Sequence, residues 1–533
     1  MIPAVSDVDA LRAQLRDRGY LTHGIERWFA LDPWSSRTFW VELATVALKA
    51  AILIALFGAL PPAAIMVFRN YPLHAVDTLG LFVSYAAVWL VAAFLAVVIV
   101  ALILKLRPAL PIDTPRALLA ISFGVSTLLV APVALWWYRF DTAPPLTELI
   151  VGSVLLAIFF LVATIVVSAA LLSFSIYELK RVPAFHQKRR GAPMTVAAAM
   201  LIALLFVPAY ADRGTVALEP MVVTSPTIAR VALIAVDGLT HEILQSRPDL
   251  ARALPHVSPI RAIPGDSTTE RWASLGTGVP TEAHGVRAIE GVRFRGGSHV
   301  LQRISRGDFV LMHVAPSLGL ARREPLPPTV RRRDYVWEIF AERGLTSVAV
   351  NWWATADAQE AGLHATAPDA IFGGARGDAL RVDALATGRF LQELDARKPR
   401  FATVYLPALD VILNRQERDR ATQLAASLRA LDGVLNAITL VRARGYDVVV
   451  AGMPGEGQSG QAVVASSIPF AGRTAWDVAP TLLDTLGFPL SAEMPGGVSQ
   501  PRIASYGAHA STAEPQPMND EYYENLKSLG YIQ

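Results

Sequence analysis

Five long apolar stretches lie in the first 211 residues of this 533-residue chain, and each is long enough to cross a lipid bilayer. With 53% hydrophobic and only 17% charged residues, the chain is too apolar for an ordinary soluble protein. The first forty residues are polar and of mixed charge, which argues against a cleavable signal peptide. The sequence therefore predicts an N-terminal segment, 1–41, and an all-α transmembrane bundle, 42–211, with spans near 42–68, 78–106, 115–138, 146–174 and 193–211.

The distribution of Lys and Arg between these stretches predicts the topology. The N-terminal segment and the second and fourth loops together hold thirteen, whereas the first and third loops hold only Arg69 and Arg139. Because basic loops stay in the cytoplasm, the N-terminus is expected there and everything beyond residue 212 outside. A four-span interpretation, with 193–211 discounted, would reverse the side of the C-terminal part.

Beyond a linker, 212–228, the pattern changes to short apolar runs that alternate with helical periodicity, which is typical of an α/β domain. This domain is predicted over 229–490, as a mostly parallel sheet with helices on both faces, followed by a tail, 491–533. Glycines, arginines and prolines in 286–333 favour an irregular insertion or a cap over one end of the sheet. The expected strands lie near 230–236, 346–351, 401–406 and 446–451, and the expected helices near 270–278, 334–344, 378–397, 418–444 and 475–486.

In open α/β sheets, functional side chains gather at the carboxyl ends of the strands. The run "ALIAVDGLT" ends at Asp237, "ATVYLPALDVILN" reaches Asp410, and Thr268 precedes a predicted helix. Each of these three residues is common at such a position, since Asp is frequent in turns and Thr is a good helix cap. The fourth run, "VVVAGMPGEG", presents no ionisable side chain before Glu456.

Taken together, these segments resemble the alkaline phosphatase superfamily, and within it type I phosphodiesterases/nucleotide pyrophosphatases and related sulfatase-like proteins. The resemblance covers about 229–490 and rests on "VDGL", "TTERWASLGTG" followed by "HGV", "NWWAT", "YLPALD" and "WDVAPTLLDTLGFPL"; the terminal "ENLKSLGYI" is a tail that such proteins often carry. It implies a site with two metal ions, usually zinc, that activate a Thr or Ser nucleophile. By this similarity, Thr268 would be the nucleophile, Asp237 and Thr268 would serve one metal, and Asp410 the other.

The sequence departs from the family at the metal ligands. Where the resemblance implies a His four residues after Asp410, an Asp-His pair after the later strand and a late Gly-x-His, the chain carries Asn414, Met453, Pro454 and Gln461. Three remaining groups are too few for two four-coordinate zinc sites. The site is therefore predicted to be vestigial, with no cofactor expected, and with zinc or another divalent metal required if the domain is active.

Other side chains near these strand ends leave an alternative open. Asp266, Glu270, His241, His284 and Glu456 could assemble an oxygen-liganded Mg²⁺ or Ca²⁺ site. Each also has a structural interpretation: His284 fits the turn at the end of a helix, and Glu270 fits the first turn of a helix.

Three functions are compatible with these features. The first is a non-catalytic membrane protein, a pseudoenzyme whose outer domain binds a ligand or assembles with other membrane-protein subunits. The second is an active phosphohydrolase or phosphotransferase that acts on a phosphoester or lipid-linked substrate at the outer face of the cytoplasmic (inner) membrane, with the domain periplasmic. The third treats the five spans as the functional part and the outer domain as a cap on a larger assembly. Nucleic acid is not an expected partner, because the part beyond residue 214 is nearly neutral, with 31 basic and 33 acidic residues. The chain has no cysteine, so disulfides and thiolate metal sites are excluded.

Overall fold

The computed structural model describes residues 39–70, 73–106, 115–138, 146–179, 199–204 and 229–532, the last range with gaps at 266, 304–307, 361, 417–418, 498–501 and 510–519. The chain divides into two compact units. One comprises residues 1–212 together with 292–322, and the other comprises 213–291 and 323–533.

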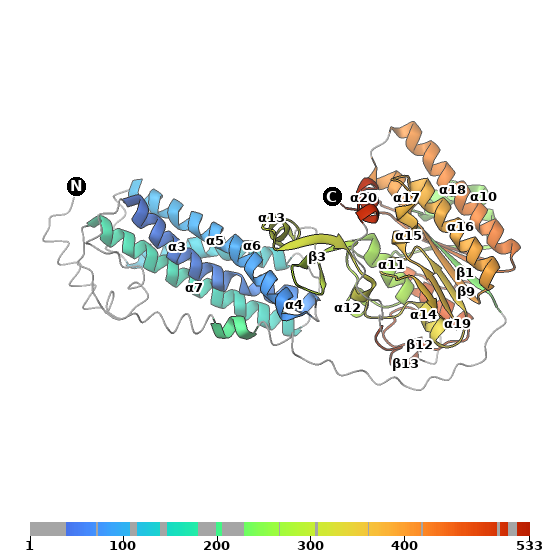
Figure 1. Ribbon diagram of the computed structural model, residues 1–533, viewed down its shortest axis with the longest axis horizontal. Coiled ribbons are helices and arrows are strands. Elements are labelled where there is room, and N and C mark those ends of the chain that lie inside the picture. The colour runs from blue at the N-terminus through green and yellow to red at the C-terminus, as the bar shows by residue number, and fades with distance from the viewer. Residues whose placement is uncertain are drawn as a thin grey trace. The chain divides into compact units, whose positions relative to one another are not determined.

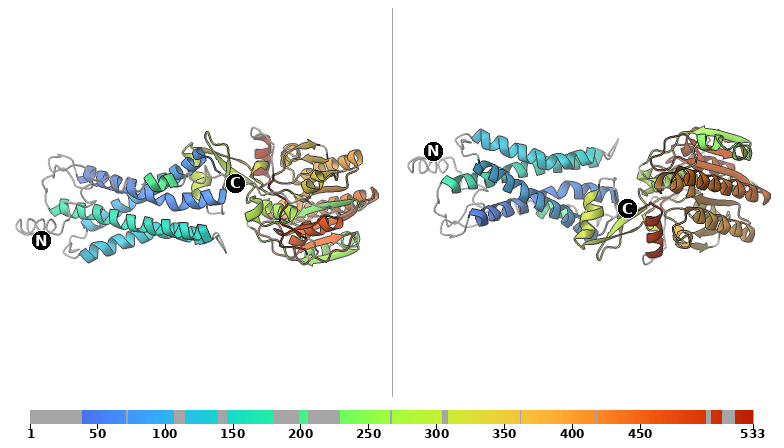
Figure 2. Two further views of the ribbon diagram at one scale, coloured as in Figure 1. Left: turned by 90° about the horizontal axis from the view of Figure 1, so that it is seen from below. Right: turned by 90° about the horizontal axis from the view of Figure 1, so that it is seen from above.

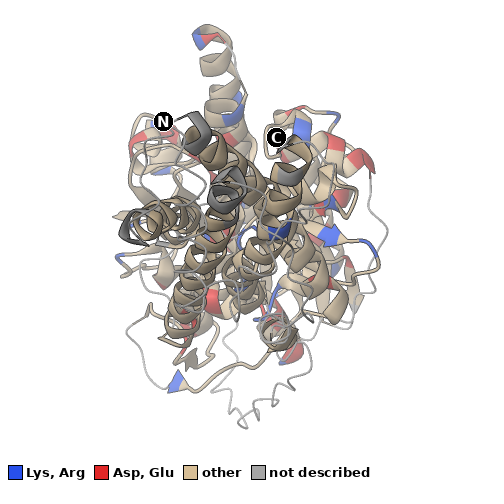
Figure 3. Ribbon diagram, turned by 90° about the vertical axis from the view of Figure 1, so that its left-hand side faces the viewer, with Lys and Arg blue, Asp and Glu red and all other residues tan. Residues whose placement is uncertain are grey.

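Long apolar helices make up most of the first unit, and they run alongside one another (Figures 1 and 2). They are α3 (Phe39–Gly58), α4 (Leu60–Asn70), α5 (Ala75–Leu106), α6 (Pro115–Tyr138) and α7 (Leu146–Leu179). Viewed from the end, their described parts show few charged residues (Figure 3). Four candidate membrane spans, Leu43–Asn70, Ala75–Ile103, Leu118–Trp137 and Leu146–Leu172, match the first four predicted from the sequence.

The fifth predicted span, 193–211, is described only over 199–204, which is helical. The fifth helix of sufficient length and apolarity is instead α18 (Arg420–Ala443). This helix packs on α16 (Ala379–Arg397) and on strands of the α/β domain, and it buries Leu431, Val434 and Ile438. Its apolar character therefore comes from a face turned to a protein core.

The second unit is built on an eight-stranded sheet of order β2-β11-β10-β1-β9-β6-β8-β7. The central strand β1 is buried at all seven positions, and its parallel neighbours are β10 and β9. Such continuous apolar runs are characteristic of parallel strands covered on both faces. The bounds are β1 (Val231–Asp237), β2 (His256–Ile260), β6 (Ser347–Val350), β7 (Ala358–Glu360), β8 (Leu363–Thr366), β9 (Phe401–Leu406), β10 (Asp447–Met453) and β11 (Ala462–Ser466).

Helices cover the sheet in two groups (Figure 1). The first contains α16 and α18. The second contains α11 (Thr268–Thr277), α14 (Val336–Glu342) and α19 (Val478–Thr485), which contact one another. The α/β architecture predicted from the sequence is therefore confirmed. The remaining short elements of this unit are α9 (His241–Gln245), α10 (Pro248–Arg252), α12 (Thr281–His284), η2 (Pro328–Val330), α15 (Pro368–Gly373), α17 (Ala408–Asp410), η3 (Val411–Arg415), η4 (Ala475–Asp477), β12 (Leu490–Ser491), β13 (Arg502–Ile503) and α20 (Asp520–Ser528).

The region predicted as an irregular cap contains regular structure. A three-stranded sheet of order β4-β3-β5 is formed by β3 (Glu290–Phe294), β4 (Val300–Gln302) and β5 (Ala321–Pro325), with η1 (Val310–Val314) and α13 (Ala315–Ser317) between β4 and β5. Residues 292–322 group with the apolar helices.

Candidate functional site

Asp237 and Asp410 follow neighbouring parallel strands. Asp237 is the last residue of β1, and Asp410 lies four residues beyond the end of β9. The chain turns sharply at Gly238, which has a φ of 81°, and a Cβ there would lie 2.7 Å from the backbone nitrogen of Asp410. Only glycine accommodates both this dihedral and this approach. The two aspartates are consequently held side by side and fully buried.

Thr268 reaches the same place from α11. Ser267 caps this helix by accepting a hydrogen bond from the backbone N–H of Glu270 at 3.1 Å, which places Thr268 in the first turn. The Thr268 side chain is fully buried, and its Oγ1 accepts a hydrogen bond from Nη2 of Arg415 at 2.8 Å. The structure thus links Thr268 to Asp410 through Arg415.

Arg415 is the centre of the arrangement, and the sequence interpretation missed it. Its Nε donates to Oδ2 of Asp410 at 2.6 Å, and its Nη1 lies 2.8 Å from Oε2 of Glu456. The ring of Tyr531 covers the guanidinium, with Cζ 4.2 Å from the ring centroid. Only 5% of the Arg415 side chain is exposed. The available signal was the position of an arginine directly after Asn414, the expected ligand position, in the segment "DVILNR".

Both carboxylate oxygens of Asp410 are occupied. Oδ1 accepts hydrogen bonds from Nδ2 of Asn414 at 2.8 Å and from the backbone N–H of Glu456 at 3.0 Å, while Oδ2 accepts from Arg415. The loop after β10 can fold against Asp410 only because residue 455 is glycine, since a Cβ there would lie 1.9 Å from Oδ1. Asn414 therefore acts as a donor to the carboxylate at the expected position of a metal-binding imidazole.

Asp237 has a different environment. Its Oδ2 accepts a hydrogen bond from the hydroxyl of Tyr405 at 2.8 Å, and its Oδ1 from the backbone N–H of Gly238 at 3.1 Å. Burial, with a further contribution from the negative charge of Asp410, raises the pKa of Asp237 to about 7, against the opposing effect of Arg271 and Arg415. Close to neutral pH this carboxyl therefore holds its proton part of the time.

The three other departures from the family pattern also have defined places. Met453, the last residue of β10, is buried beside Asp237 in the strand register. The carbonyl of Pro454 accepts a hydrogen bond from Nη1 of Arg271 at 2.5 Å. Gln461 is exposed just before β11, and its backbone N–H donates to Oε1 of Glu242 at 3.3 Å.

Among the alternative ligands, His284 and Glu270 are engaged in hydrogen bonds with other residues. His284 ends α12; its Nε2 lies 2.8 Å from Oγ of Ser274, and its Nδ1 accepts from the backbone N–H of Val286. Glu270 lies in the first turn of α11 and accepts a hydrogen bond from Thr281. His241 begins α9, Glu456 is paired with Arg415, and Asp266 is not among the described residues.

These contacts do not fit a pair of divalent cations. Asp410 and Thr268, which would be ligands by the family resemblance, are both hydrogen bonded to a guanidinium that carries a fixed positive charge. A metal ion within bonding distance of these oxygens would displace Arg415 or be repelled by it. The donor set around Asp410 consists of an amide, a backbone N–H and a guanidinium, which bind a carboxylate rather than a metal.

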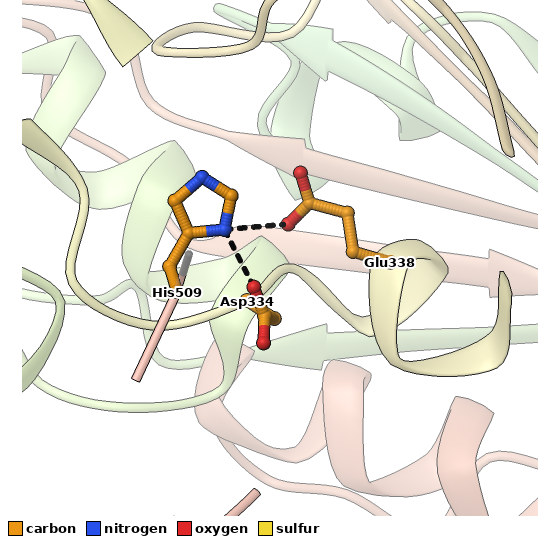
Figure 4. A group of neighbouring side chains, drawn as sticks. All are labelled: Asp334, Glu338 and His509. Carbon is orange, nitrogen blue, oxygen red and sulfur yellow. Dashed lines mark hydrogen bonds and ion pairs between the residues drawn. The ribbon is translucent and has the colours of Figure 1, made fainter. Parts of the chain in front are cut away.

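A second group of metal-binding residue types consists of Asp334, Glu338 and His509 (Figure 4). Nδ1 of His509 lies 2.6 Å from Oδ1 of Asp334 and 4.0 Å from Oε2 of Glu338. Arg331 binds both oxygens of Glu338, each at 2.5 Å, and its side chain is 1% exposed. An arginine again supplies the positive charge, so the group serves to fasten the segment around His509 to the start of α14.

Comparison with known families gives one match. The family described as type I phosphodiesterase / nucleotide pyrophosphatase matches residues 231–452. Curated proteins give no significant match.

Solved structures with some likeness include a phosphonoacetate hydrolase from Sinorhizobium meliloti 1021, at 12% identity and a TM-score of 0.30, over 44% of this chain and 60% of that one. Murine and human ectonucleotide pyrophosphatase / phosphodiesterase 5 each match at 13% identity and a TM-score of 0.30, over 42% of this chain and 56% of theirs. The chain therefore covers less than two thirds of these proteins, and the likeness says nothing about its activity.

The family match spans the segments that carry Asp237, Thr268 and Asp410, and it ends within β10, just before Met453. Residues 231–452 of this chain are therefore similar to the type I phosphodiesterase / nucleotide pyrophosphatase family.

Proposed function

We propose that this protein is a membrane-anchored pseudoenzyme, whose phosphodiesterase-like domain is a non-catalytic binding or assembly module. The observation that carries the proposal is the bridge that Arg415 makes between Asp410 and Thr268. A guanidinium neutralises Asp410, but it provides no open coordination position for a phosphoryl oxygen. Thr268 has an alcohol pKa far above neutrality, and it donates to no base among the contacts described above, so it stays a poor nucleophile.

The charge distribution supports a location for this module. With thirteen basic residues on one side of the spans and two on the other, we propose that the N-terminus is cytoplasmic and that the domain lies outside the cytoplasmic (inner) membrane, in the periplasm. A ligand for the module would be a lipid-linked molecule, and a partner would be another subunit in the same membrane.

The test combines metal analysis with an activity assay on the full-length protein in nanodiscs. Wild type, Thr268→Ala and Arg415→Ala are purified with zinc present, and bound metal and hydrolysis of a model phosphodiester are measured. We expect no stoichiometric metal pair in wild type, and equal background hydrolysis in wild type and Thr268→Ala.

Two equivalents of metal in the wild type, or turnover that Thr268→Ala abolishes, would establish the second function, an active phosphohydrolase or phosphotransferase. Arg415→Ala separates two causes of metal exclusion. If the guanidinium alone excludes metal, the variant gains zinc; if the missing imidazoles also matter, it does not. Either result is compatible with the proposal, which is decided by the wild type and by Thr268→Ala.

A further inference from the structure

Residues 292–322, called here the insertion, are attached to the ends of the membrane helices by specific contacts. Asn70, at the end of α4, accepts a hydrogen bond from the backbone N–H of Gln302 at 2.7 Å and donates to its carbonyl at 3.3 Å. Phe294 packs so closely on α5 that a Cβ at Gly80 would lie 2.3 Å from its ring. Nδ1 of His299 lies 3.2 Å from Oδ2 of Asp77, in the first turn of α5.

The insertion also follows α5 some way along its length. The hydroxyl of Tyr85 donates to Oδ1 of Asp308 at 3.3 Å, and both side chains are buried. At 1.5 Å per residue, Tyr85 lies about 15 Å along the axis from the start of α5, and the candidate span Ala75–Ile103 is about 43 Å long. This length is close to the full thickness of a bilayer with its headgroups, roughly 40–45 Å. The contact with Asp308 is therefore deeper than one headgroup layer.

Two large apolar side chains, Phe309 and Leu318, are exposed on the insertion, next to the exposed polar residues His313 and Ser317. In η1 and its flanks, Leu311 and Met312 are 1% and 5% exposed against the helix bundle, whereas Phe309 and Leu318 are 64% and 53% exposed. These exposures resemble those of Val91 and Leu128 in the membrane-spanning helices, at 60% and 75%. In water such side chains would be costly, at about 25 cal/mol per Å² of apolar surface.

The charge of the insertion is strongly one-sided. It contains Arg293, Arg295, Arg303, Arg306 and Arg322, and its single acidic residue is the buried Asp308. Arg295 and Arg322 are exposed. The part of the chain beyond residue 214 is nearly neutral as a whole, so this excess is local. Basic and aromatic or apolar side chains together are typical of segments that lie in the interface of an anionic membrane.

We infer that the insertion is a membrane-interface anchor, with Phe309 and Leu318 among the acyl chains and Arg295 and Arg322 at anionic headgroups. The partner is thus a lipid surface that contains anionic lipids, in the same leaflet that receives the first turns of α5. The inference depends on the membrane helices and not on whether the domain is catalytic.

The chain has no cysteine, so a spin label reacts only with the single cysteine that each variant introduces. Phe309→Cys and Leu318→Cys are compared with Leu424→Cys, a control on α18 that is 59% exposed in the α/β domain. Each full-length variant is placed in nanodiscs of phosphatidylcholine with phosphatidylglycerol, and collisions of the label with oxygen and with a nickel chelate are measured.

Labels at 309 and 318 are expected to collide with oxygen several-fold more often than with the nickel chelate, relative to the label at 424. Equal nickel accessibility at all three sites would overturn the inference. Exclusion of both reagents at 309 and 318 would also overturn it, because it would indicate a protein contact.

The second arm tests the lipid class. Arg295→Gln with Arg322→Gln should move the 309 label toward water in nanodiscs that contain phosphatidylglycerol, and less so in pure phosphatidylcholine. A shift of the same size in both lipids would show that the arginines do not bind anionic headgroups. It would contradict the inference that the membrane partner contains anionic lipids.

Discussion

Arg415 supplies the positive charge that compensates the buried carboxylate of Asp410. A fully buried carboxylate is costly unless a positive charge or several donors compensate it. In a metal-dependent relative this compensation would come from the metal ion, whereas here it comes from three donors, one of them charged. A guanidinium forms directed hydrogen bonds and keeps its charge at all accessible pH values.

Removal of this guanidinium should be strongly destabilising. Arg415→Ala leaves Asp410 buried without its cation, for which a loss of about 3–5 kcal/mol in the free energy of unfolding is expected. Arg444→Ala is the matched control, because Arg444 also binds both oxygens of an aspartate, Asp395, at 2.8 Å, but on the surface. There the expected loss is at most about 1 kcal/mol.

Both variants are compared with wild type by denaturant unfolding of the full chain in nanodiscs. Asp410→Asn should restore part of the stability that Arg415→Ala removes, because it deletes the orphaned charge. Equal effects at positions 415 and 444, or no recovery in the double variant, would contradict the role assigned to Arg415.

His284 gives the α/β domain a dependence on acidic pH. Burial, together with the charges of Arg287, Arg331 and Arg332, lowers the pKa of His284 to about 3. The unfolded chain binds a proton near the ordinary value of 6.5, so folding stability contributed by the neutral imidazole is complete above that value and is lost as the pH falls from about 6.5 toward 3.

His284→Gln should therefore flatten the fall in unfolding midpoint between these pH values, although it lowers stability at neutral pH. His256→Gln, at an exposed position on β2, is the control for the loss of an imidazole. Thermal midpoints measured across this range check the prediction, and parallel profiles of wild type and His284→Gln would refute it.

At the scale of single elements, the C-terminal segment closes the site. In α20, Asn525 accepts a hydrogen bond from the backbone N–H of Gly377 at 2.7 Å. Beyond it, Tyr531 packs against Trp353 and Phe372, with ring centroids 5.4 and 6.0 Å away, and covers Arg415. The last described residues of the chain thus contribute to the burial of a group that is far away in sequence.

Gly530 makes this closure possible and offers a sharp test. It has a φ of 79°, and a Cβ would lie 2.9 Å from the backbone oxygen of Arg415. Gly445 has nearly the same φ, 80°, but a Cβ there would meet nothing within 4 Å. Gly445→Ala should cost about 1–2 kcal/mol from the dihedral alone.

Gly530→Ala adds a collision with backbone and is expected to cost more and to release the C-terminal segment. Hydrogen exchange in 520–532 should increase in Gly530→Ala and stay unchanged in Gly445→Ala. If the two variants lose equal stability and show the same exchange, the close approach of residue 530 to the backbone of Arg415 does not contribute to stability.

At the scale of the whole molecule, the chain passes between the helical unit and the α/β unit three times, because the insertion interrupts the α/β unit and groups with the helices. The number of spans decides on which side of the membrane the α/β domain lies, and this number depends on whether 193–211 spans.

A C-terminal fusion decides the topology. With five spans, a fused alkaline phosphatase should be active and a fused green fluorescent protein dark, since the first needs the periplasm and the second the cytoplasm to fold. Fluorescence of the second fusion would place the domain in the cytoplasm and would indicate that 193–211 does not span. Fusions after residue 190 provide the control for the preceding loop, which should be cytoplasmic.

The sequence by itself was sufficient for the membrane helices and for the four central strands β1, β6, β9 and β10, because both are specified by local apolar patterns. The helix expected near 418–444 was assigned to the α/β domain, and α18 lies there although it is long and apolar enough to span a membrane, since hydropathy cannot tell a helix that faces lipid from one that faces a protein core. The short edge strand β2 and its neighbour β11 were not predicted, because their pairing depends on partners distant in sequence.

At the site, the sequence was sufficient to predict that Asp237, Thr268 and Asp410 follow strand ends or open a helix, and that Asn414, Met453, Pro454 and Gln461 stand at expected ligand positions. Asn414 and Arg415 follow Asp410 closely in sequence, but only the tertiary structure decided what surrounds Arg415, because Thr268, Glu456 and Tyr531 come from separate segments. Likewise, the attachment of the insertion to α5 depends on contacts between residues more than two hundred positions apart. Burial and charge compensation are properties of the folded chain as a whole, and for that reason they could not be read from any one stretch of it.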